Sequence, residues 1–340
     1  SGIDAENYFR TFKTDGVLIK DGWSYYGWEN AINETTDAIS NGLSRLYQSA
    51  FLSKDNILSL SDEVIIHSNS NLTLNEIKAT NSVKEDHIID VAVQAHTVID
   101  SGYNLNDIRL THLNKKAVME DGENFFTSSS IKDRVLDKIP LIQNWIKEVR
   151  LLEQSEKMPE PEYQPGCKDC DFSGHCLSQL PETNILTIPN IHINRIRALQ
   201  TQGIFDVRAI PENFQLTDSQ AKYVDTIHTG EILIDDKNIE NELENLIYPI
   251  HFMDFETYNY SLPIVAETGP WEQVPFQWSI HHLENSGELT HDEYLFSKSL
   301  DGYDIRKEFL DTLLDKLEHD EGSIVVYNAS FEKMVLNNLG

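Results

Sequence analysis

The stretch Tyr248-Pro-Ile-His-Phe-Met-Asp254-Phe-Glu256-Thr257 decides the fold of the C-terminal part of the chain. Its apolar residues suit a buried strand, and the run ends in two carboxylates that are separated by one residue. Because strand side chains alternate between faces, Phe252, Asp254 and Glu256 are expected to point the same way. Two neighbouring acids on a core strand are costly unless their charge is neutralised, as a divalent metal ion would do. The alternative is an edge strand whose acids face water.

The residues that follow this strand predict the remaining elements of an α/β domain. Two runs of β type, 275–283 and 288–296, are joined by Glu284-Asn-Ser-Gly287, which is a hairpin signal. Apolar residues at helical spacing predict an amphipathic helix over 305–317. A short apolar strand, 323–327, then leads into a second helix. The predicted order is therefore strand, hairpin, helix, strand, helix.

Asp-x-Glu-Thr at the end of a first strand, in this order of elements, resembles the DnaQ-like (DEDD) 3′–5′ exonucleases, which have a ribonuclease-H-like fold. Asn328-Ala-Ser-Phe-Glu332 is similar to their second motif, although that family normally has Asp at the position of Glu332. The resemblance implies that Asp254, Glu256 and Glu332 bind catalytic Mg²⁺ or Mn²⁺. It also implies that a further carboxylate and a catalytic Tyr or His lie beyond residue 340, so the exonuclease site is expected to be incomplete here.

A second group of polar residues lies in the first half of the chain. Leu72-Thr-Leu-Asn-Glu76-Ile-Lys78 predicts a strand in which Glu76 and Lys78 share one face. Upstream, Asp62 is expected to open an apolar strand. Downstream, a helix of about 87–99 places Asp90 and Gln94 one turn apart on one face.

An acid, then Glu-x-Lys, then a helix that carries Gln resembles the PD-(D/E)XK nuclease core of the RecB-like branch. The resemblance implies that Asp62 and Glu76 hold Mg²⁺ or Mn²⁺, which polarises the scissile phosphate and activates a water. Lys78 would orient that water or offset charge in the transition state, with Gln94 beside it. RecB-like enzymes usually have Gln-x-x-x-Tyr on the helix, where this chain has Val98. They often have Glu where this chain has Gln48.

The segment Cys167-Lys-Asp-Cys170-Asp-Phe-Ser-Gly-His-Cys176 contains every cysteine of the chain. This spacing in an intracellular protein favours a metal over a disulfide. It resembles the C-terminal half of the iron–sulfur staple of RecB-like nucleases, whose fourth cysteine comes from upstream and is absent from these residues. A zinc site that includes His175 is an alternative, although the adjacent ligand Cys176 strains its geometry. Three free thiols are the remaining alternative.

The charge of the chain limits how it could bind nucleic acid. It has 56 acidic and 27 basic residues, with a net charge of −29, which argues against broad phosphate binding on a basic surface. The compact basic spots are Lys115-Lys116 and Arg195-x-Arg197. A nuclease of this composition is expected to localise its positive charge through bound metal, a narrow groove or a basic protein partner. Without a signal peptide or a membrane-spanning apolar run, a cytoplasmic location is expected.

Together these features resemble a bacterial family of unknown function in which a RecB-like nuclease with a cysteine cluster precedes a DnaQ-like exonuclease. The resemblance implies that the chain is trimmed at both ends. We predict a mixed α/β protein with a PD-(D/E)XK nuclease domain (1–157), a cysteine knuckle (158–184), a helical bridge similar to helix–hairpin–helix modules (185–247) and an incomplete ribonuclease-H-like domain (248–340). The predicted function is metal-dependent hydrolysis of DNA or RNA. The alternative is an inactive nucleic-acid-binding or scaffold protein that retains both folds.

Overall fold

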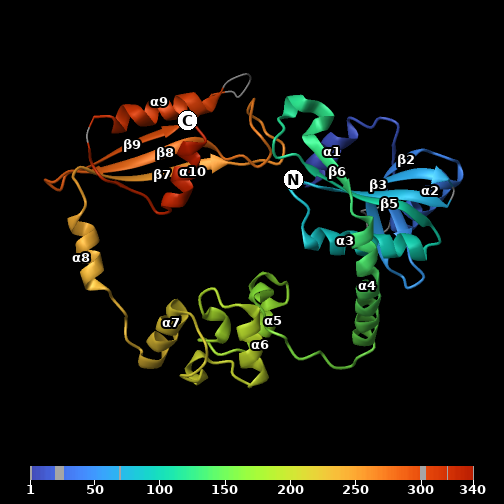
Figure 1. The fold of residues 1–340 in the computed structure, drawn as a ribbon, viewed down its shortest axis with the longest axis horizontal. Coiled ribbons are helices and arrows are strands. Elements are labelled where there is room, and N and C mark those ends of the chain that lie inside the picture. The colour runs from blue at the N-terminus through green and yellow to red at the C-terminus, as the bar shows by residue number, and fades with distance from the viewer. Residues whose placement is uncertain (1, 20–26, 69, 299–303, 320, 340) are drawn as a thin grey trace. The chain divides into compact units, whose positions relative to one another are not determined.

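The computed structural model describes residues 2–19, 27–68, 70–298, 304–319 and 321–339 (Figure 1). It confirms the predicted mixed α/β class, because both sheets combine parallel and antiparallel strands and carry helices. The chain divides into two compact units. The two-sheet unit comprises 1–149 and 246–340, and the helical unit comprises 150–245. No helix within the described ranges combines the length and the apolar character needed to cross a membrane.

The N-terminal sheet has the strand order β1-β2-β3-β4-β5-β6. Strands β2, β3 and β4 form an antiparallel meander, β5 runs parallel to β4, and β6 closes the sheet in antiparallel pairing. A parallel neighbour needs a crossover, which α3 supplies. The elements are α1 (Gly2–Arg10), β1 (Val17–Leu18), α2 (Trp28–Ser40), β2 (Arg45–Leu52), β3 (Leu58–Ser68), β4 (Asn71–Lys78), α3 (Glu85–Asp100), β5 (Asn104–Leu113), η1 (Met119–Phe125), β6 (Phe126–Ser130) and α4 (Lys132–Glu153).

Apolar residues of β4 and α3 form the centre of the main core. Leu72 and Leu74 are buried with Ile88 and Val91 of the helix, as the predicted faces require. The predicted helix of about 87–99 is confirmed, with two further residues at its start and one at its end. This packing fixes the face of β4 that also carries Glu76, since strand side chains alternate.

Strand β3 begins earlier than expected. The prediction that Asp62 opens this strand is wrong, because the strand starts at Leu58. Residues 58–61 pair with β2, with Leu58 opposite Leu52 and Leu60 opposite Ala50. This long-range pairing has no local signature in the sequence. It places Asp62 inside the strand, between Ser61 and Glu63, which both pair with residues of β2.

The C-terminal sheet has the order β10-β7-β8-β9 and confirms the predicted sequence of elements. Strands β7 and β8 are antiparallel, as are β8 and β9, whereas β10 runs parallel to β7. The helices pack through Phe309 and Val335 on a core that contains Met253 and Phe255. The elements are β7 (Ile250–Tyr258), β8 (Val274–Leu283), β9 (Leu289–Leu295), α9 (Ile305–Leu317), β10 (Ile324–Val325) and α10 (Ala329–Asn337).

The alternation predicted for β7 is confirmed. Met253 and Phe255 are buried, whereas Phe252, Asp254 and Glu256 are exposed on the other face. Strand β7 lies between β10 and β8, so it is not an edge strand. The acids nevertheless face away from the helix-covered core. The face of the strand that carries these acids was therefore predictable from the sequence. The sequence did not predict that this face is exposed.

The helical unit has a core of its own. Tyr163, from the segment before the cysteines, is buried with Ile185, Ile196 and Val224. The cysteine segment and the bridge, which were predicted separately, thus share one core. Thr217 caps α7 with its hydroxyl oxygen accepting from the backbone amide of Gln220. The elements are η2 (Pro165–Asp169), α5 (Ser173–Leu177), η3 (Ile185–Thr187), α6 (Ile193–Thr201), η4 (Val207–Ala209), α7 (Asp218–Thr229) and α8 (Asp236–Glu244).

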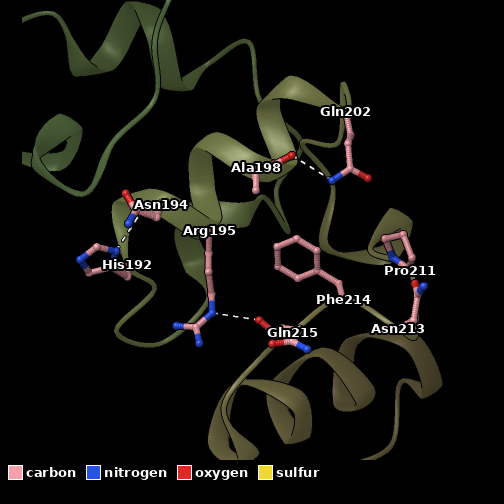
Figure 2. A pocket seen from close by; sticks show the side chains of 9 residues that line it. All are labelled: His192, Asn194, Arg195, Ala198, Gln202, Pro211, Asn213, Phe214 and Gln215. Atoms are coloured by element: carbon pink, nitrogen blue, oxygen red, sulfur yellow. Dashed lines mark hydrogen bonds between the residues drawn. The ribbon is translucent and has the colours of Figure 1, made fainter.

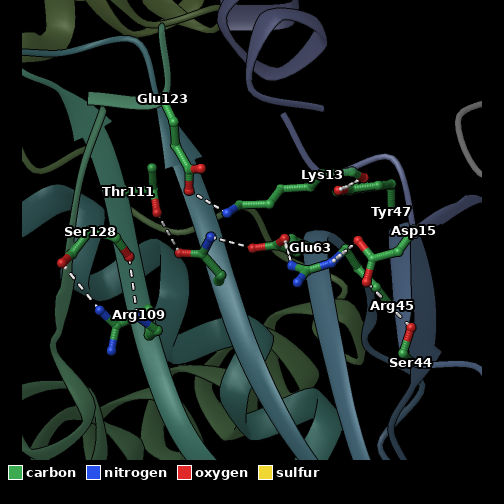
Figure 3. A network of polar contacts seen from close by, with 11 residues as sticks. Lys13, Asp15, Ser44, Arg45, Tyr47, Glu63, Arg109, Thr111, Glu123 and Ser128 are labelled. Carbon is green, nitrogen blue, oxygen red and sulfur yellow. Dashed lines mark hydrogen bonds and ion pairs between the residues drawn. The ribbon is translucent and has the colours of Figure 1, made fainter. Parts of the chain in front are cut away.

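A polar network crosses the N-terminal sheet from β2 to β5 (Figure 3). The Arg45 guanidinium pairs with Glu63, whose Oε2 accepts from Asn75 Nδ2 at 2.6 Å. Asn75 Oδ1 in turn accepts from Thr111 Oγ1 at 2.8 Å. Glu63, Asn75 and Thr111 are all buried, so the network satisfies polar groups that have lost water. Because a slip by one residue would break these bonds, the network holds the strands in register.

Thr111→Val is expected to lower the free energy of unfolding by about 1 to 2 kcal/mol, because Asn75 Oδ1 would be left buried without its donor. Ser128→Ala is the matched control. Its hydroxyl accepts from Arg109 at 3.1 Å on the exposed strand β6, and its loss should cost less than about 0.5 kcal/mol. Urea unfolding of both variants measures the difference. Equal midpoints for the two variants would show that the network contributes nothing to stability.

Candidate functional site

Asp62 and Glu76 lie on neighbouring antiparallel strands. Strand β3 pairs with β4 so that Glu63 is opposite Asn75, and the next step of this register places Asp62 opposite Glu76. The backbone amide of Ile77 donates to Asp62 Oδ2 at 2.8 Å. Since these acids alternate with Glu63 and Asn75, they project on the face opposite the polar network. The structure therefore brings the two predicted acids together.

Glu76 is held by the two other residues that the sequence singled out. Gln94 Nε2 donates to Glu76 Oε2 at 2.8 Å, and Lys78 Nζ lies 2.8 Å from Glu76 Oε1. Lys78 also pairs with Asp90 on α3. Glu76 is 5% exposed and Gln94 is 6% exposed, while Gln94 Oε1 is buried without a hydrogen-bond partner in the described structure. The predicted spacing on α3 thus puts Asp90 and Gln94 on the side of the strand that bears the acids.

Glu6 belongs to the same site, although sequence reasoning missed it. It lies on α1, and its Oε2 accepts from Gln48 Nε2 at 2.8 Å. The same Gln48 nitrogen lies 3.2 Å from Asp62 Oδ1, so Gln48 links the two acids. The available signal was weak, because Glu6 is one acid at the border of the apolar face formed by Ala5 and Phe9.

Gln48 adopts an unusual backbone conformation. Its φ is +55° inside β2, a value that L residues other than Asn and Asp seldom adopt. The residue is 6% exposed, and its side chain reaches Glu6 and Asp62. Backbone strain of this kind persists only where surrounding structure enforces it, and it is concentrated at functional sites.

Burial and mutual repulsion shift the pKa values of the three acids upward. Burial raises the pKa of Asp62 to about 7, and the charge of Glu6 adds to the rise. Burial raises the pKa of Glu76 to about 8, with Asp62 as the second cause. The pKa of Glu6 is raised by burial and by Glu76. Asp62 and Glu76 therefore favour a bound proton or a bound cation near neutral pH.

Lys78 stays protonated beside these acids. Burial alone would lower the pKa of Lys78, but its charge and hydrogen-bond interactions with Glu76 and Asp90 raise it above the usual value. Lys78 is therefore a fixed positive charge rather than a base at neutral pH. Its side chain is 25% exposed, so one side remains accessible to a ligand.

The donor set of this site fits a hard divalent cation. Glu6, Asp62 and Glu76 offer carboxylate oxygens, which Mg²⁺ and Mn²⁺ prefer. Among the described residues, no group of three or more His, Cys, Asp or Glu side chains already has an arrangement that could hold a metal ion. Nitrogen atoms of Gln48 and Lys78 contact the carboxylates instead. Those two side chains would have to turn away for the acids to converge on an ion.

The acids predicted for the C-terminal domain are less closely associated. Asp254 and Glu256 share the exposed face of β7. Glu332 on α10 is 4% exposed, and its Oε2 is buried without a hydrogen-bond partner. Within the described ranges, no hydrogen bond or ion pair joins Glu332 to either of the other two. The structure thus brings Asp254 and Glu256 together and gives no direct contact to Glu332.

The three cysteines lie around two short helices of the helical unit. Cys167 is in η2, Cys170 follows it, and Cys176 is in α5. Cys167 and Cys176 are half-buried, Cys170 is exposed, and none forms a disulfide. The Cys167 sulfur accepts from the backbone amide of Gln164 at 3.3 Å. Metal binding by these cysteines stays a prediction.

Comparison with known protein families finds a match for the C-terminal part of this chain. Residues 251–340 match the family model of a domain of unknown function (DUF2779). The matched segment begins inside β7 and includes Asp254, Glu256 and Glu332. No curated protein matches the chain. The predicted resemblance to a family of unknown function is therefore supported for the C-terminal quarter of the chain.

Proposed function

We propose that this protein is a metal-dependent nuclease that hydrolyses phosphodiester bonds, with its main site at Asp62 of β3 and Glu76 of β4. One observation carries the proposal. Two carboxylates, the half-buried Asp62 and the buried Glu76, lie on adjacent strands beside Lys78, and the fold retains them despite the cost that their raised pKa values imply.

The chemistry of the site follows from its side chains. Glu6, Asp62 and Glu76 would hold Mg²⁺ or Mn²⁺. When bound, such an ion polarises a phosphate and lowers the pKa of a water. The Ile77 amide and Gln94 orient the two strand carboxylates. Lys78 stands where its charge offsets the negative charge that develops on the phosphate in the transition state.

The same proposal extends to the C-terminal domain and the cysteines. Asp254, Glu256 and Glu332 would form part of a 3′–5′ exonuclease site of the DEDD type. The shared face of the first two acids supports this, as does the buried, unpartnered oxygen of Glu332, which a ligand would satisfy. Cys167, Cys170 and Cys176 would hold an iron–sulfur cluster or Zn²⁺, with a further ligand from outside these residues.

Digestion of end-labelled single-stranded DNA and RNA in Mn²⁺ tests the main site. The wild type is expected to cleave at least one of them, and Glu76→Gln is expected to lower the rate by at least about a thousandfold, because a metal ligand is lost. Glu85→Gln, an exposed acid on α3, is the matched control and should cleave like the wild type.

Two results would contradict the proposal. Equal cleavage by the wild type and Glu76→Gln would show that the activity comes from another site or from a contaminant. If the protein binds the DNA or the RNA but neither the wild type nor any variant cleaves it, the alternative function is favoured. That alternative is an inactive nucleic-acid-binding protein.

A further inference from the structure

The helical unit contains a polar groove whose lining includes none of its cysteines (Figure 2). Its volume is about 640 Å³, within the range of small-ligand sites. One wall is formed by residues of α6, and the other by Pro211, Asn213, Phe214 and Gln215. None of the described residues that line the groove is acidic, although acidic residues outnumber basic ones two to one in the chain.

Arg195 supplies the positive charge of this groove. Its Nε donates to the backbone oxygen of Gln215 at 2.9 Å, which fixes the guanidinium across the groove (Figure 2). The two terminal nitrogens form no ion pair with any described carboxylate. Most other arginines of the chain are paired with Asp or Glu, namely Arg45, Arg109, Arg134, Arg150, Arg197, Arg208 and Arg306. A guanidinium that is held in place but not neutralised is ready to bind an anionic oxygen.

The other lining residues suit a flat, polar ligand. The half-buried ring of Phe214 packs on the core of the helical unit and also lines the groove. Asn194 and Asn213 present side-chain amides, which can donate to and accept from the edge of a base. Aromatic stacking together with amide contacts is how single-stranded nucleic acids are recognised.

We propose that this groove binds one nucleotide of a single-stranded nucleic acid, with the phosphate on Arg195 and the base on Phe214. The proposal rests on the proposed nuclease function, since a chain with a net charge of −29 needs a local site that holds its substrate. A free mononucleotide carries the same phosphate and base, so the test must distinguish binding of a single strand from binding of a free mononucleotide.

The test is fluorescence anisotropy with labelled 12-nucleotide single-stranded DNA and RNA, on the full chain, in EDTA and at several salt concentrations. Arg195→Ala is expected to weaken binding about tenfold and to reduce the slope of log K against log salt by about 0.7, the value for one phosphate contact on a single strand. Phe214→Leu is expected to weaken binding about tenfold with no change in this slope.

Arg197→Ala is the matched control, because Arg197 lies on the same helix but pairs with Glu162 at 3.1 Å. It should bind like the wild type. Equal affinities of Arg195→Ala and Arg197→Ala would overturn the proposal, as would displacement of the strand by micromolar AMP, which would assign the groove to a free nucleotide. Binding is measured without metal and does not depend on cleavage. A failure of the proposed catalysis would therefore leave this result unchanged.

Discussion

Lys78→Met is expected to lower the rate of phosphodiester cleavage by about a hundredfold to a thousandfold. The substitution keeps an unbranched side chain that is one atom shorter, and it removes the charge that faces Glu76 at 2.8 Å. Loss of one positioned group that stabilises transition-state charge typically has an effect of this size. The effect should appear in kcat more than in KM, because the interaction strengthens as charge develops on the phosphate.

Single-turnover cleavage of end-labelled strands in Mn²⁺ measures this effect. Lys84→Met is the matched control, because Lys84 is exposed beside the start of α3 and should be dispensable. The structure also predicts a modest loss of stability for Lys78→Met, since Lys78 is an ion-pair partner of the buried Glu76 rather than a free surface lysine. Unimpaired cleavage by Lys78→Met would remove Lys78 from the site.

Glu76→Gln is expected to remove the contribution of Glu76 to the pH dependence of stability. The pKa of Glu76 is about 8 in the folded protein, against 4.5 for an unperturbed glutamate. The folded state therefore binds more protons than the unfolded state between these values, and the stability of the wild type falls as the pH rises through this window. Glu76→Gln carries no such charge, so its stability relative to the wild type should rise by about 1 to 3 kcal/mol from pH 5 to pH 9.

The neighbours of Glu76 can accommodate the amide. Gln94 Oε1 has no hydrogen-bond partner in the described structure, so a turn of the Gln94 amide lets this oxygen accept from the new NH₂ group. Urea unfolding at pH 5, 7 and 9 measures the trend, with the exposed Glu85→Gln as control. A constant difference between Glu76→Gln and the wild type at all three pH values would mean that Glu76 titrates normally.

Mn²⁺ provides an independent measurement on the same variant. An ion that binds only the folded state stabilises it, so Mn²⁺ should raise the unfolding midpoint of the wild type at pH 8. Glu76→Gln should gain little, because one ligand is lost. An equal rise in the unfolding midpoint of both proteins would show that Glu76 does not bind the ion. This result would not depend on any cleavage assay.

Local patterns in the sequence were sufficient to predict most elements. The period of two in 252–256 predicted which face of β7 carries Asp254 and Glu256, and the helical period over 305–317 predicted α9. Glu76, Lys78 and the helix with Gln94 were found in the same way. These features depend on neighbours within one or two turns or on strand alternation, which the chain encodes directly.

Only the tertiary structure brought Glu6 and Gln48 to Asp62 and set the start of β3. It also placed Arg195 across a groove from Phe214. These contacts join residues that lie far apart in sequence, or depend on which strand pairs with which. Burial and pairing are properties of the assembled core, so no local period records them. The sequence by itself predicted Asp62, Glu76, Lys78 and Gln94 as candidate site residues, and tertiary packing decided which of them meet and added Glu6.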